Sequence, residues 1–327
     1  MQYLNLFILY FIILFLIKYI SSKTELYDRP NKRKIHTTKT FNTGGLIIYV
    51  FYLIVINSFE FNYNIELIIS IGFFVCLIGF IDDRINLSPY IKIIFIIIPT
   101  LYLIFSGIKI DNIGIYEFIG VLNLGKFQIP FLILSTTLLI NAINYIDGID
   151  GLILVFFISC ISYYIFLIDN TDAINLLKIL LIPLIINLIL NMLPSRSNFK
   201  FFSGNIGSLF IGFFISFLTI NLYSEFGIHP VYLIWPLWYP VSDFLFVSLN
   251  RIINKKSVFK ADNSHLHHII FNKFKKNHFK TVLLFFGSNA LIISAGYMLS
   301  NYSKLMSLII FILGSIFYFI LRFRLEK

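Results

Sequence analysis

Two groups of acidic residues follow apolar stretches of this chain. Asp82 and Asp83 end the first stretch, and Asp147 and Asp150 follow the second. The chain has only 16 aspartates and glutamates among 327 residues, and carboxylates at the ends of hydrophobic segments usually mark a site. Adjacent aspartates cannot share one helical face, so we expect one to take a metal or a proton while the other fixes an arginine or lysine. Lys92, about one helical turn into the next apolar stretch, could hold a phosphate at the membrane interface.

The second acidic group lies in the segment Asn141–Gly151. Asn141 and Asn144 are three residues apart, so on a helix they present their amide oxygens on one side. Mg²⁺ prefers oxygen ligands and is often completed by the phosphates of a substrate. The segment therefore predicts a cation and phosphate site that includes Asp147 and Asp150, although Asp-Gly steps also make ordinary tight turns.

A third polar segment is Phe202–Ser208, which opens a later apolar stretch and contains Asn205. Its glycines would let backbone N–H groups approach an anion at a helix start. A helix cap made by Ser203 or Asn205 explains the same residues without a function. The first motif also has an alternative without a function. Asp82 and Asp83 could be a solvated acid pair that ends a hydrophobic segment.

Histidines and bases form two further candidate sites. His265, His267 and His268 could bind a metal or hydrogen-bond to sugar hydroxyls and phosphate oxygens, although on a helix His265 and His267 would point apart. The basic segment from Arg29 to His36 suits a polyanionic substrate. Topology signalling alone explains much of that charge.

Composition decides which elements must position these residues. The chain is 58% hydrophobic and 13% charged, whereas a soluble domain carries roughly 25% charged residues. Both cysteines, Cys76 and Cys160, fall inside apolar runs, which argues against a disulfide scaffold or a zinc site. Residues 1–20 have neither a basic start nor a cleavage site and are interpreted as a retained span. The sequence therefore predicts an integral membrane protein.

The expected fold is all-α, a multi-pass bundle of about 10–11 transmembrane helices that forms one domain over residues 1–327. A helix needs about 20 mostly apolar residues to cross a bilayer. The stretch 108–128 is too polar to span and is expected to form a surface hairpin. The expected spans are 3–20, 44–59, 65–81, 89–107, 129–146, 151–168, 173–193, 206–222, 230–250, 279–299 and 303–321.

Basic residues predict the orientation, because cytoplasmic loops collect lysine and arginine. We number the connections between the predicted spans in chain order. The even-numbered connections hold only Lys109, Lys126 and Lys304, and the odd-numbered connections and the C-terminal tail hold most of the remaining lysines and arginines. This distribution places the N-terminus outside and the C-terminus in the cytoplasm. The predicted cytoplasmic loops are 21–43, 82–90, 144–150, 194–205 and 251–278, so Asp82, Asp83 and the segment around Asp147 face the cytoplasm together.

Taken together, these motifs resemble the polyprenyl-phosphate N-acetylhexosamine-1-phosphate transferases, of the glycosyltransferase family 4 type. The resemblance covers nearly the whole chain in order. Residues Arg29–Gly45 are similar to the first cytoplasmic loop of that family, and Asp82-Asp83 with residues 86–89 are similar to its paired-aspartate motif. Residues Asn141–Leu152 resemble its most specific signature, and His265–His268 resemble its sugar-specificity loop.

The resemblance implies a Mg²⁺-dependent enzyme, with Mn²⁺ as an alternative metal. It would transfer a sugar 1-phosphate, by default N-acetylglucosamine 1-phosphate, from a UDP-N-acetylhexosamine to undecaprenyl phosphate. UMP would be released, and a cell-surface polysaccharide would be started. The expected location is the bacterial cytoplasmic (inner) membrane, with the site facing the cytoplasm. No nucleic-acid partner is expected, and homo-oligomerisation stays open.

The resemblance also implies roles for the candidate residues. Asp82 or Asp83 would deprotonate or orient the lipid phosphate, and Lys92 would hold it. Three residues would bind the metal. A second set of residues, which includes Asp147 from the first, would bind the two substrates. The expected metal ligands are Asn144, Asn205 and Asp147. The expected substrate-binding residues are Lys92, Asn141, Asp147, Asp150, His36, His265, His267 and His268.

Three positions depart from the family pattern. Asn205 stands where a metal-binding aspartate is usual, which predicts weaker Mg²⁺ binding or a changed metal preference. Phe41 stands where a proline is usual, and Asn263 where an arginine is usual. A catalytically silent paralogue is therefore one alternative. Two others are a membrane prenyltransferase, which would leave the histidines unexplained, and a transporter, for which Asp243 is the only candidate charge deep in a span.

Overall fold

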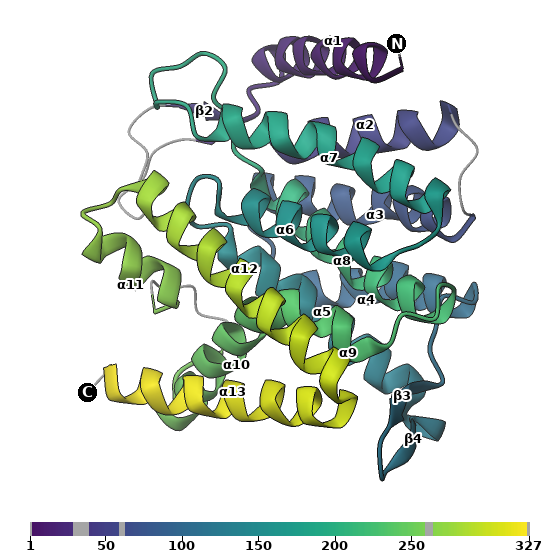
Figure 1. Ribbon diagram of the computed structural model, residues 1–327. Coiled ribbons are helices and arrows are strands. Elements are labelled where there is room, and N and C mark those ends of the chain that lie inside the picture. The colour runs from purple at the N-terminus through teal and green to yellow at the C-terminus, as the bar shows by residue number, and fades with distance from the viewer. Residues whose placement is uncertain (1, 29–38, 59–62, 259–263, 326–327) are drawn as a thin grey trace.

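The computed structural model of the chain describes residues 2–28, 39–58, 63–258 and 264–325. Within these residues the backbone is largely helical, as the apolar stretches predict (Figure 1). The 3-10 turn Gly125–Phe127 leads into α5, and the turn Trp235–Leu237 joins α9 to α10. The α-helices are α1 (Gln2–Lys23), α2 (Gly44–Ser58), α3 (Tyr63–Ile85), α4 (Pro89–Phe105), α5 (Gln128–Ile146), α6 (Leu152–Leu167), α7 (Thr171–Asn191), α8 (Gly204–Ser224), α9 (Pro230–Ile234), α10 (Trp238–Ile253), α11 (Leu266–Lys273), α12 (His278–Tyr302) and α13 (Lys304–Leu325).

Helix length confirms a multi-pass membrane protein. Among the described residues, seven helices are long and apolar enough to cross a membrane, namely α1, α3, α5, α7, α8, α12 and α13. Three shorter apolar helices, α2, α4 and α6, have 15, 17 and 16 residues. Every predicted span falls on a helix, with 230–250 falling on α9 and α10. Length alone therefore supports seven of the ten to eleven predicted spans.

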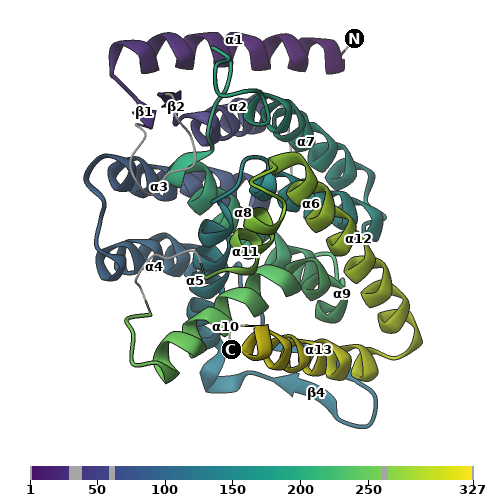
Figure 2. The same ribbon diagram turned by 90° about the vertical axis from the view of Figure 1, so that its left-hand side faces the viewer.

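Helix α8 lies at the centre of the bundle (Figure 2). Of its most apolar stretch, 89% is buried, because apolar residues surround the helix on all sides. It packs against α2, α3 and α5. A Cβ atom on Gly45 would lie 2.1 Å from the Cα of Gly207, and one on Gly79 would lie 2.6 Å from the carbonyl oxygen of Asn205. Glycine at these positions lets α2 and α3 reach the first turn of α8.

The polar stretch 108–128 forms the predicted hairpin. Strand β3 (Asn112–Tyr116) pairs antiparallel with β4 (Gly120–Asn123), with Ile115 opposite Val121. A second short antiparallel pair joins β1 (Tyr27–Asp28) to β2 (Thr40–Phe41).

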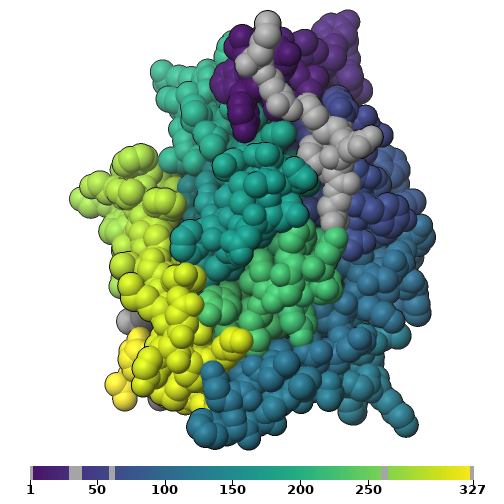
Figure 3. Space-filling view, turned by 45° about the vertical axis from the view of Figure 1, so that its right-hand side comes forward, coloured from purple at the N-terminus to yellow at the C-terminus, as the bar shows by residue number. Residues whose placement is uncertain are grey.

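Helix α13 lies at the edge of the molecule, and only 11% of its most apolar stretch is buried. Figure 3 shows the yellow C-terminal helices along one edge of the surface. The carboxylate of Glu117, in the hairpin turn, accepts hydrogen bonds from the backbone N–H groups of Lys304 and Leu305 at 3.0 and 2.8 Å. Glu117 therefore caps the start of α13, where a negative charge complements the helix dipole.

Candidate active site

Asp83 lies at the point where the end of α3 meets the start of α8. Its Oδ1 accepts hydrogen bonds from the backbone N–H of Asn205 at 3.2 Å and from the side-chain amide of Asn205 at 2.9 Å. The Asn42 side chain also hydrogen-bonds to Asp83. Its Oδ2 is enclosed by protein and has no hydrogen-bond partner among the described residues. One oxygen therefore caps α8, while the other retains its full capacity to accept.

Both carboxylate oxygens of Asp82 have partners, in contrast to those of Asp83 within the described residues. Its Oδ2 pairs with the Lys92 ammonium at 2.5 Å, and its Oδ1 accepts from the backbone N–H of Leu87 at 3.0 Å. The structure thus shows one half of the expected division between the two aspartates, because Asp82 fixes a lysine. Lys92 comes from the first turn of α4, so the pair also fixes the turn between α3 and α4.

Two amides extend the Asp83 cluster. The amide nitrogen of Asn144, near the end of α5, donates to the Asn205 oxygen at 3.1 Å and to the Ser208 hydroxyl at 2.6 Å. Asn205 therefore accepts from Asn144 and donates to Asp83. The alternative of a local cap is not supported, because Ser203 makes no side-chain capping bond and the Asn205 amide turns to Asp83.

Asp147 follows directly after α5, close to this cluster. Removal from water, followed by the negative charges of Asp83 and Asp150, raises the pKa of Asp147 to about 7. A carboxyl group with a raised pKa beside another carboxylate lacks a compensating positive charge. The structure therefore brings Asp83, Asn144, Asn205 and Asp147 to one place, as the sequence predicts.

Asp150 has a positive partner of its own. Its carboxylate pairs with Lys200 at 2.6 Å, and the His278 ring lies 3.6 Å from the same oxygen. Lys200 is buried and also donates to the backbone carbonyl of Leu193 at 2.8 Å. These bonds tie the 147–151 turn to the loop after α7. Sequence reasoning assigned Lys200 only to topology, and its pairing with Asp150 has no local signal.

The histidine segment reaches the same turn. A Cβ atom on Gly148 would lie 2.6 Å from the His268 ring, so this glycine makes room for the histidine. Tyr145, the residue after Asn144, stacks on His265 with ring centroids 5.2 Å apart. The segment thus packs against the end of α5, which carries two of the clustered residues.

The expectation that His265 and His267 point apart is wrong. His265 has extended backbone and precedes α11, so the pair does not follow helical spacing. Their rings stack with centroids 5.5 Å apart and planes 20° apart. Both side chains are buried, whereas His268 is partly exposed. Burial lowers the pKa of His267 well below its usual range, so this ring is neutral.

Two predicted residues stand outside this geometry. The Asn141 amide nitrogen donates to the Thr137 carbonyl of its own helix at 2.8 Å. His36 lies outside the described residues, as does Asn263. Asn42 is a residue that sequence reasoning missed; the only signal was its place just before Gly44 and Gly45.

The residues around Asp83 fit a hard divalent cation in their chemistry. They offer carboxylate, amide and hydroxyl oxygens, which Mg²⁺ prefers, and one enclosed carboxylate oxygen has no donor in the part of the chain that the structure describes. Within the described residues, no group of three or more histidine, cysteine, aspartate or glutamate side chains is arranged to hold a metal. A cation here would therefore rely on amides, and on phosphate oxygens from a substrate.

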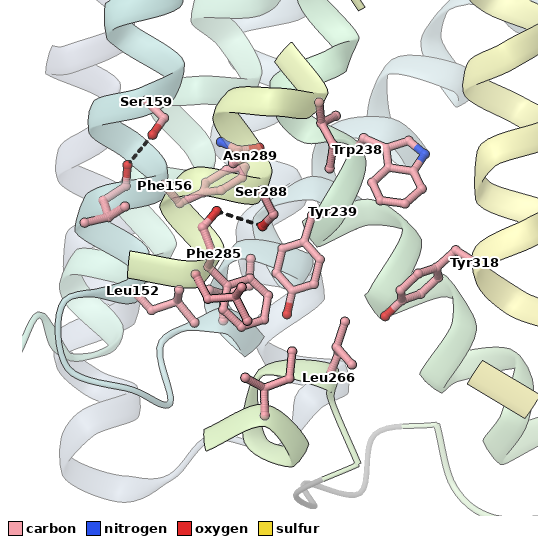
Figure 4. A pocket seen from close by; sticks show the side chains of 15 residues that line it. Leu152, Phe156, Ser159, Trp238, Tyr239, Leu266, Phe285, Ser288, Asn289 and Tyr318 are labelled. Carbon is pink, nitrogen blue, oxygen red and sulfur yellow. Dashed lines mark hydrogen bonds between the residues drawn. The ribbon is translucent and has the colours of Figure 1, made fainter. Parts of the chain in front are cut away.

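An apolar cavity of about 250 Å³ lies beside the site, between α6, α10 and α12. Ile146, just before Asp147, lines it, and Leu266 of the histidine segment lines it as well (Figure 4). The buried amide of Asn289 is a polar group among these walls and has no hydrogen-bond partner within the described residues.

Comparison with known proteins places the candidate site within a region of family similarity. Residues 65–223 match the sequence model of glycosyl transferase family 4. The chain is 28% identical to a probable undecaprenyl-phosphate N-acetylglucosaminyl 1-phosphate transferase of Bacillus subtilis, over 77% of this chain and 72% of that protein.

It is also 25% identical to the undecaprenyl-phosphate alpha-N-acetylglucosaminyl 1-phosphate transferase of Escherichia coli K12, over 82% of this chain and 75% of that one. The Haemophilus influenzae protein of the same name is 26% identical, over 80% of this chain and 76% of that protein. The matched region carries Asp83, Asn144, Asp147 and Asn205. Residues 65–223 therefore carry the sequence pattern of glycosyl transferase family 4, and the chain is similar to undecaprenyl-phosphate N-acetylglucosaminyl 1-phosphate transferases.

Proposed function

We propose that this protein transfers N-acetylglucosamine 1-phosphate from UDP-N-acetylglucosamine to undecaprenyl phosphate in a Mg²⁺-dependent reaction that releases UMP. The site faces the cytoplasm, the N-terminus lies outside, and the product starts a surface polysaccharide. The distribution of lysine and arginine supports this orientation. The acceptor and the sugar follow the names of the matched relatives.

One observation carries the proposal: among the described residues, Asp83 holds an enclosed carboxylate oxygen with no donor, beside the linked side-chain amides of Asn144 and Asn205. An enclosed carboxylate without a partner is costly, and it persists where a ligand completes it. Phosphoryl transfer between two anions requires positioning and neutralisation of charge. A carboxylate that can receive a proton, beside oxygen ligands for a cation, supplies both.

In the proposed reaction, an oxygen of the lipid phosphate attacks the phosphorus that carries the sugar. The bond between this phosphorus and the oxygen of UMP breaks as the new P–O bond forms, and UMP leaves. Asp83 takes the proton if the lipid phosphate still carries one. Lys92, held by Asp82, attracts the lipid phosphate from the interface.

Mg²⁺, when bound, would neutralise the phosphates during transfer. Asp147 and the amide oxygens of Asn144 and Asn205 would hold it, next to the Asp83 carboxylate. Asp150 acts indirectly, because its bond to Lys200 fixes the turn that carries Asp147.

The apolar cavity suits the first part of the polyprenyl chain. Its walls are almost entirely apolar, and Ile146, next to Asp147, is one of the lining residues. An acceptor held there would place its phosphate near the end of α5. The cost of exposing an apolar chain to water favours this placement.

A direct assay tests the proposal. Purified protein in detergent is mixed with UDP-N-acetylglucosamine, undecaprenyl phosphate and Mg²⁺, and UMP is measured. We expect UMP release that requires all three additions and stops with EDTA. Folded protein that releases no UMP with any UDP-amino sugar would contradict the enzymatic proposal.

A second candidate is a protein that binds the substrates without turnover. The uncharged Asn205 in the cation site favours it, because an amide gives a cation less charge than an aspartate does. Calorimetry that detects binding of the UDP-sugar, together with an absence of UMP in the assay, would support this candidate over the first.

A further inference from the structure

Asp243, in α10, joins two distant parts of the chain through its buried carboxylate. Its Oδ2 lies 2.7 Å from the His265 Nδ1. Its Oδ1 accepts from the Tyr318 hydroxyl at 2.5 Å and from the Arg322 guanidinium at 2.8 Å. It also accepts from the backbone N–H of Leu266 at 3.1 Å. The carboxylate is 2% exposed and has donors on both oxygens.

Arg322 reaches the histidine segment directly as well. Its second terminal nitrogen donates to the Ser264 carbonyl at 2.6 Å, and its guanidinium lies 4.7 Å from the centre of the Phe246 ring. The side chain is 1% exposed, although α13 is otherwise the least buried of the long apolar helices. A long cation is rarely fully buried unless it is paired. The last turns of α13 are therefore fastened to the residues that begin α11.

Stability alone is a weak explanation for this ionic cluster. Buried ion pairs can often be replaced by apolar residues without loss of stability, because desolvation offsets their attraction. The hydroxyls of Ser242 and Ser315 already link α10 to α13 at 3.0 Å without touching the histidine segment. What the Asp243 cluster adds is control over residues 264–266.

The three histidines differ in what they can reach. His265 is 2% exposed, its Nδ1 faces the Asp243 carboxylate, and its ring lies between Tyr145 and His267. A carboxylate only accepts hydrogen bonds, so Nδ1 carries the proton. His268 is partly exposed, and its ring lies against Gly148.

We propose that Asp243, Arg322 and His265 are positioning residues that hold the histidine segment where it meets the nucleotide-sugar diphosphate. The inference rests on the proposed function for the identity of that ligand. It makes α13 part of the machinery of the site, although the helix lies at the edge of the bundle.

Two substitutions of His265 separate positioning from direct contact. In His265→Asn, the amide nitrogen can replace Nδ1 as the donor to Asp243, whereas His265→Leu has no donor. We expect His265→Asn to keep the KM for the UDP-sugar within about threefold of the wild-type value. His265→Leu should lower kcat/KM for the UDP-sugar about 100-fold, because misplaced binding groups slow the reaction. Equal losses in the two variants would overturn the positioning role.

Arg322→Met tests the link to α13. Acting through His265, it should raise the KM for the UDP-sugar about tenfold and leave the KM for the lipid phosphate unchanged, with little further loss in a His265→Leu background. Arg324→Met, on the exposed side of the same turn, is the matched control. Ser315→Ala removes the other link to α10. If the double variant Arg322→Met, His265→Leu loses activity by the product of the two single losses, the inference is overturned.

Amide hydrogen exchange gives a readout without activity. Arg322→Met should speed exchange in residues 264–273, above all at Leu266, while α8 stays protected and Arg324→Met changes nothing. Unchanged exchange would refute the fastening of the segment. The two proposals can fail independently. If Arg322→Met speeds exchange but the wild-type protein releases no UMP, the fastening is supported and the proposed function is contradicted.

Discussion

Asp83 and Asp243 are two carboxylates whose surroundings differ. Within the described residues, Asp83 has donors on one oxygen only, and all of those identified are amides. Asp243 has donors on both oxygens, including a guanidinium and an imidazole. The first can still accept a proton or a cation. The second is fully occupied.

The difference separates chemistry from positioning. A carboxylate with spare capacity and no positive partner is suited to complete its bonds with a ligand. A saturated carboxylate fixes the groups around it instead. The same contrast holds between the adjacent aspartates, because Asp82 is bound to Lys92 and Asp83 is not paired with a cation among the described residues.

The comparison fails most clearly if Asp83 is dispensable. Asp83→Asn keeps the size of the side chain but removes the charge and the capacity to take a proton. We expect UMP release to fall by about 10³-fold or more, within the range for loss of an acid or base. The measurement is UMP release at saturating substrates, together with the melting temperature of the purified protein.

Asp172→Asn, in the first turn of α7 and far from the site in sequence, is the control and should keep full activity. An Asp83→Asn protein that is folded and retains more than a tenth of wild-type turnover would show that the open carboxylate is not the reacting group.

Lys92→Met should have the next largest effect. It leaves Asp82 buried without its cation and removes the charge proposed to attract the lipid phosphate. We expect the KM for undecaprenyl phosphate to rise about tenfold to 100-fold, with a lower melting temperature, because breaking a buried pair strands the remaining charge. Lys126→Met, an exposed lysine near the hairpin, should change neither. A rise confined to the KM for the UDP-sugar would assign Lys92 to the other substrate.

Asn205→Asp sharpens the comparison by adding a charge to the open cluster. It removes the amide that donates to Asp83 and brings two carboxylates together, so the variant should be less stable without a metal. With Mg²⁺, the added carboxylate should lower the half-saturating concentration about tenfold and raise the melting temperature more than in wild type.

Titrations of activity and of melting temperature with Mg²⁺ measure both effects. Asn170→Asp, at the cap of α7, gives an aspartate away from the site as the control. An unchanged Mg²⁺ requirement in Asn205→Asp would mean that position 205 does not contact the cation.

Residues close in sequence made part of this contrast predictable. The spacing of Asp82, Asp83 and Lys92 predicts that one aspartate pairs with a cation, and the structure has that pair. The 108–128 hairpin and the convergence of Asn144, Asp147 and Asn205 at span ends were also predicted, because turn residues and apolar lengths are local signals.

The other half of the contrast was not predictable from local patterns. Arg322 lies 79 positions from Asp243, and only the packing of α13 on α10 brings them together. The histidine stack was mispredicted because the helix begins after His265, so helical periodicity does not apply across it. The sequence indicated no partner for Asp243, because Arg322 is too distant along the chain for a local pattern to pair them.

The smallest expected effect concerns a third carboxylate, Glu117, which is exposed and caps the start of α13. Its bonds to the backbone of Leu305 and Lys304 lower its pKa from 4.5 to about 2. A group with a lowered pKa stabilises the fold above its ordinary pKa, and this contribution is lost as the pH falls from about 4.5 toward 2. Glu117→Gln should therefore lower the melting temperature by only about 1–2 °C at pH 7.

The difference between wild type and Glu117→Gln should shrink as the pH approaches 2, and the KM for both substrates should stay unchanged. Differential scanning fluorimetry across this pH range measures the first expectation, and the UMP assay at neutral pH measures the second. A changed KM for the UDP-sugar would mean that α13 transmits changes at its start to the histidine segment. Fastening at Arg322 alone would then be insufficient to explain how the helix serves the site.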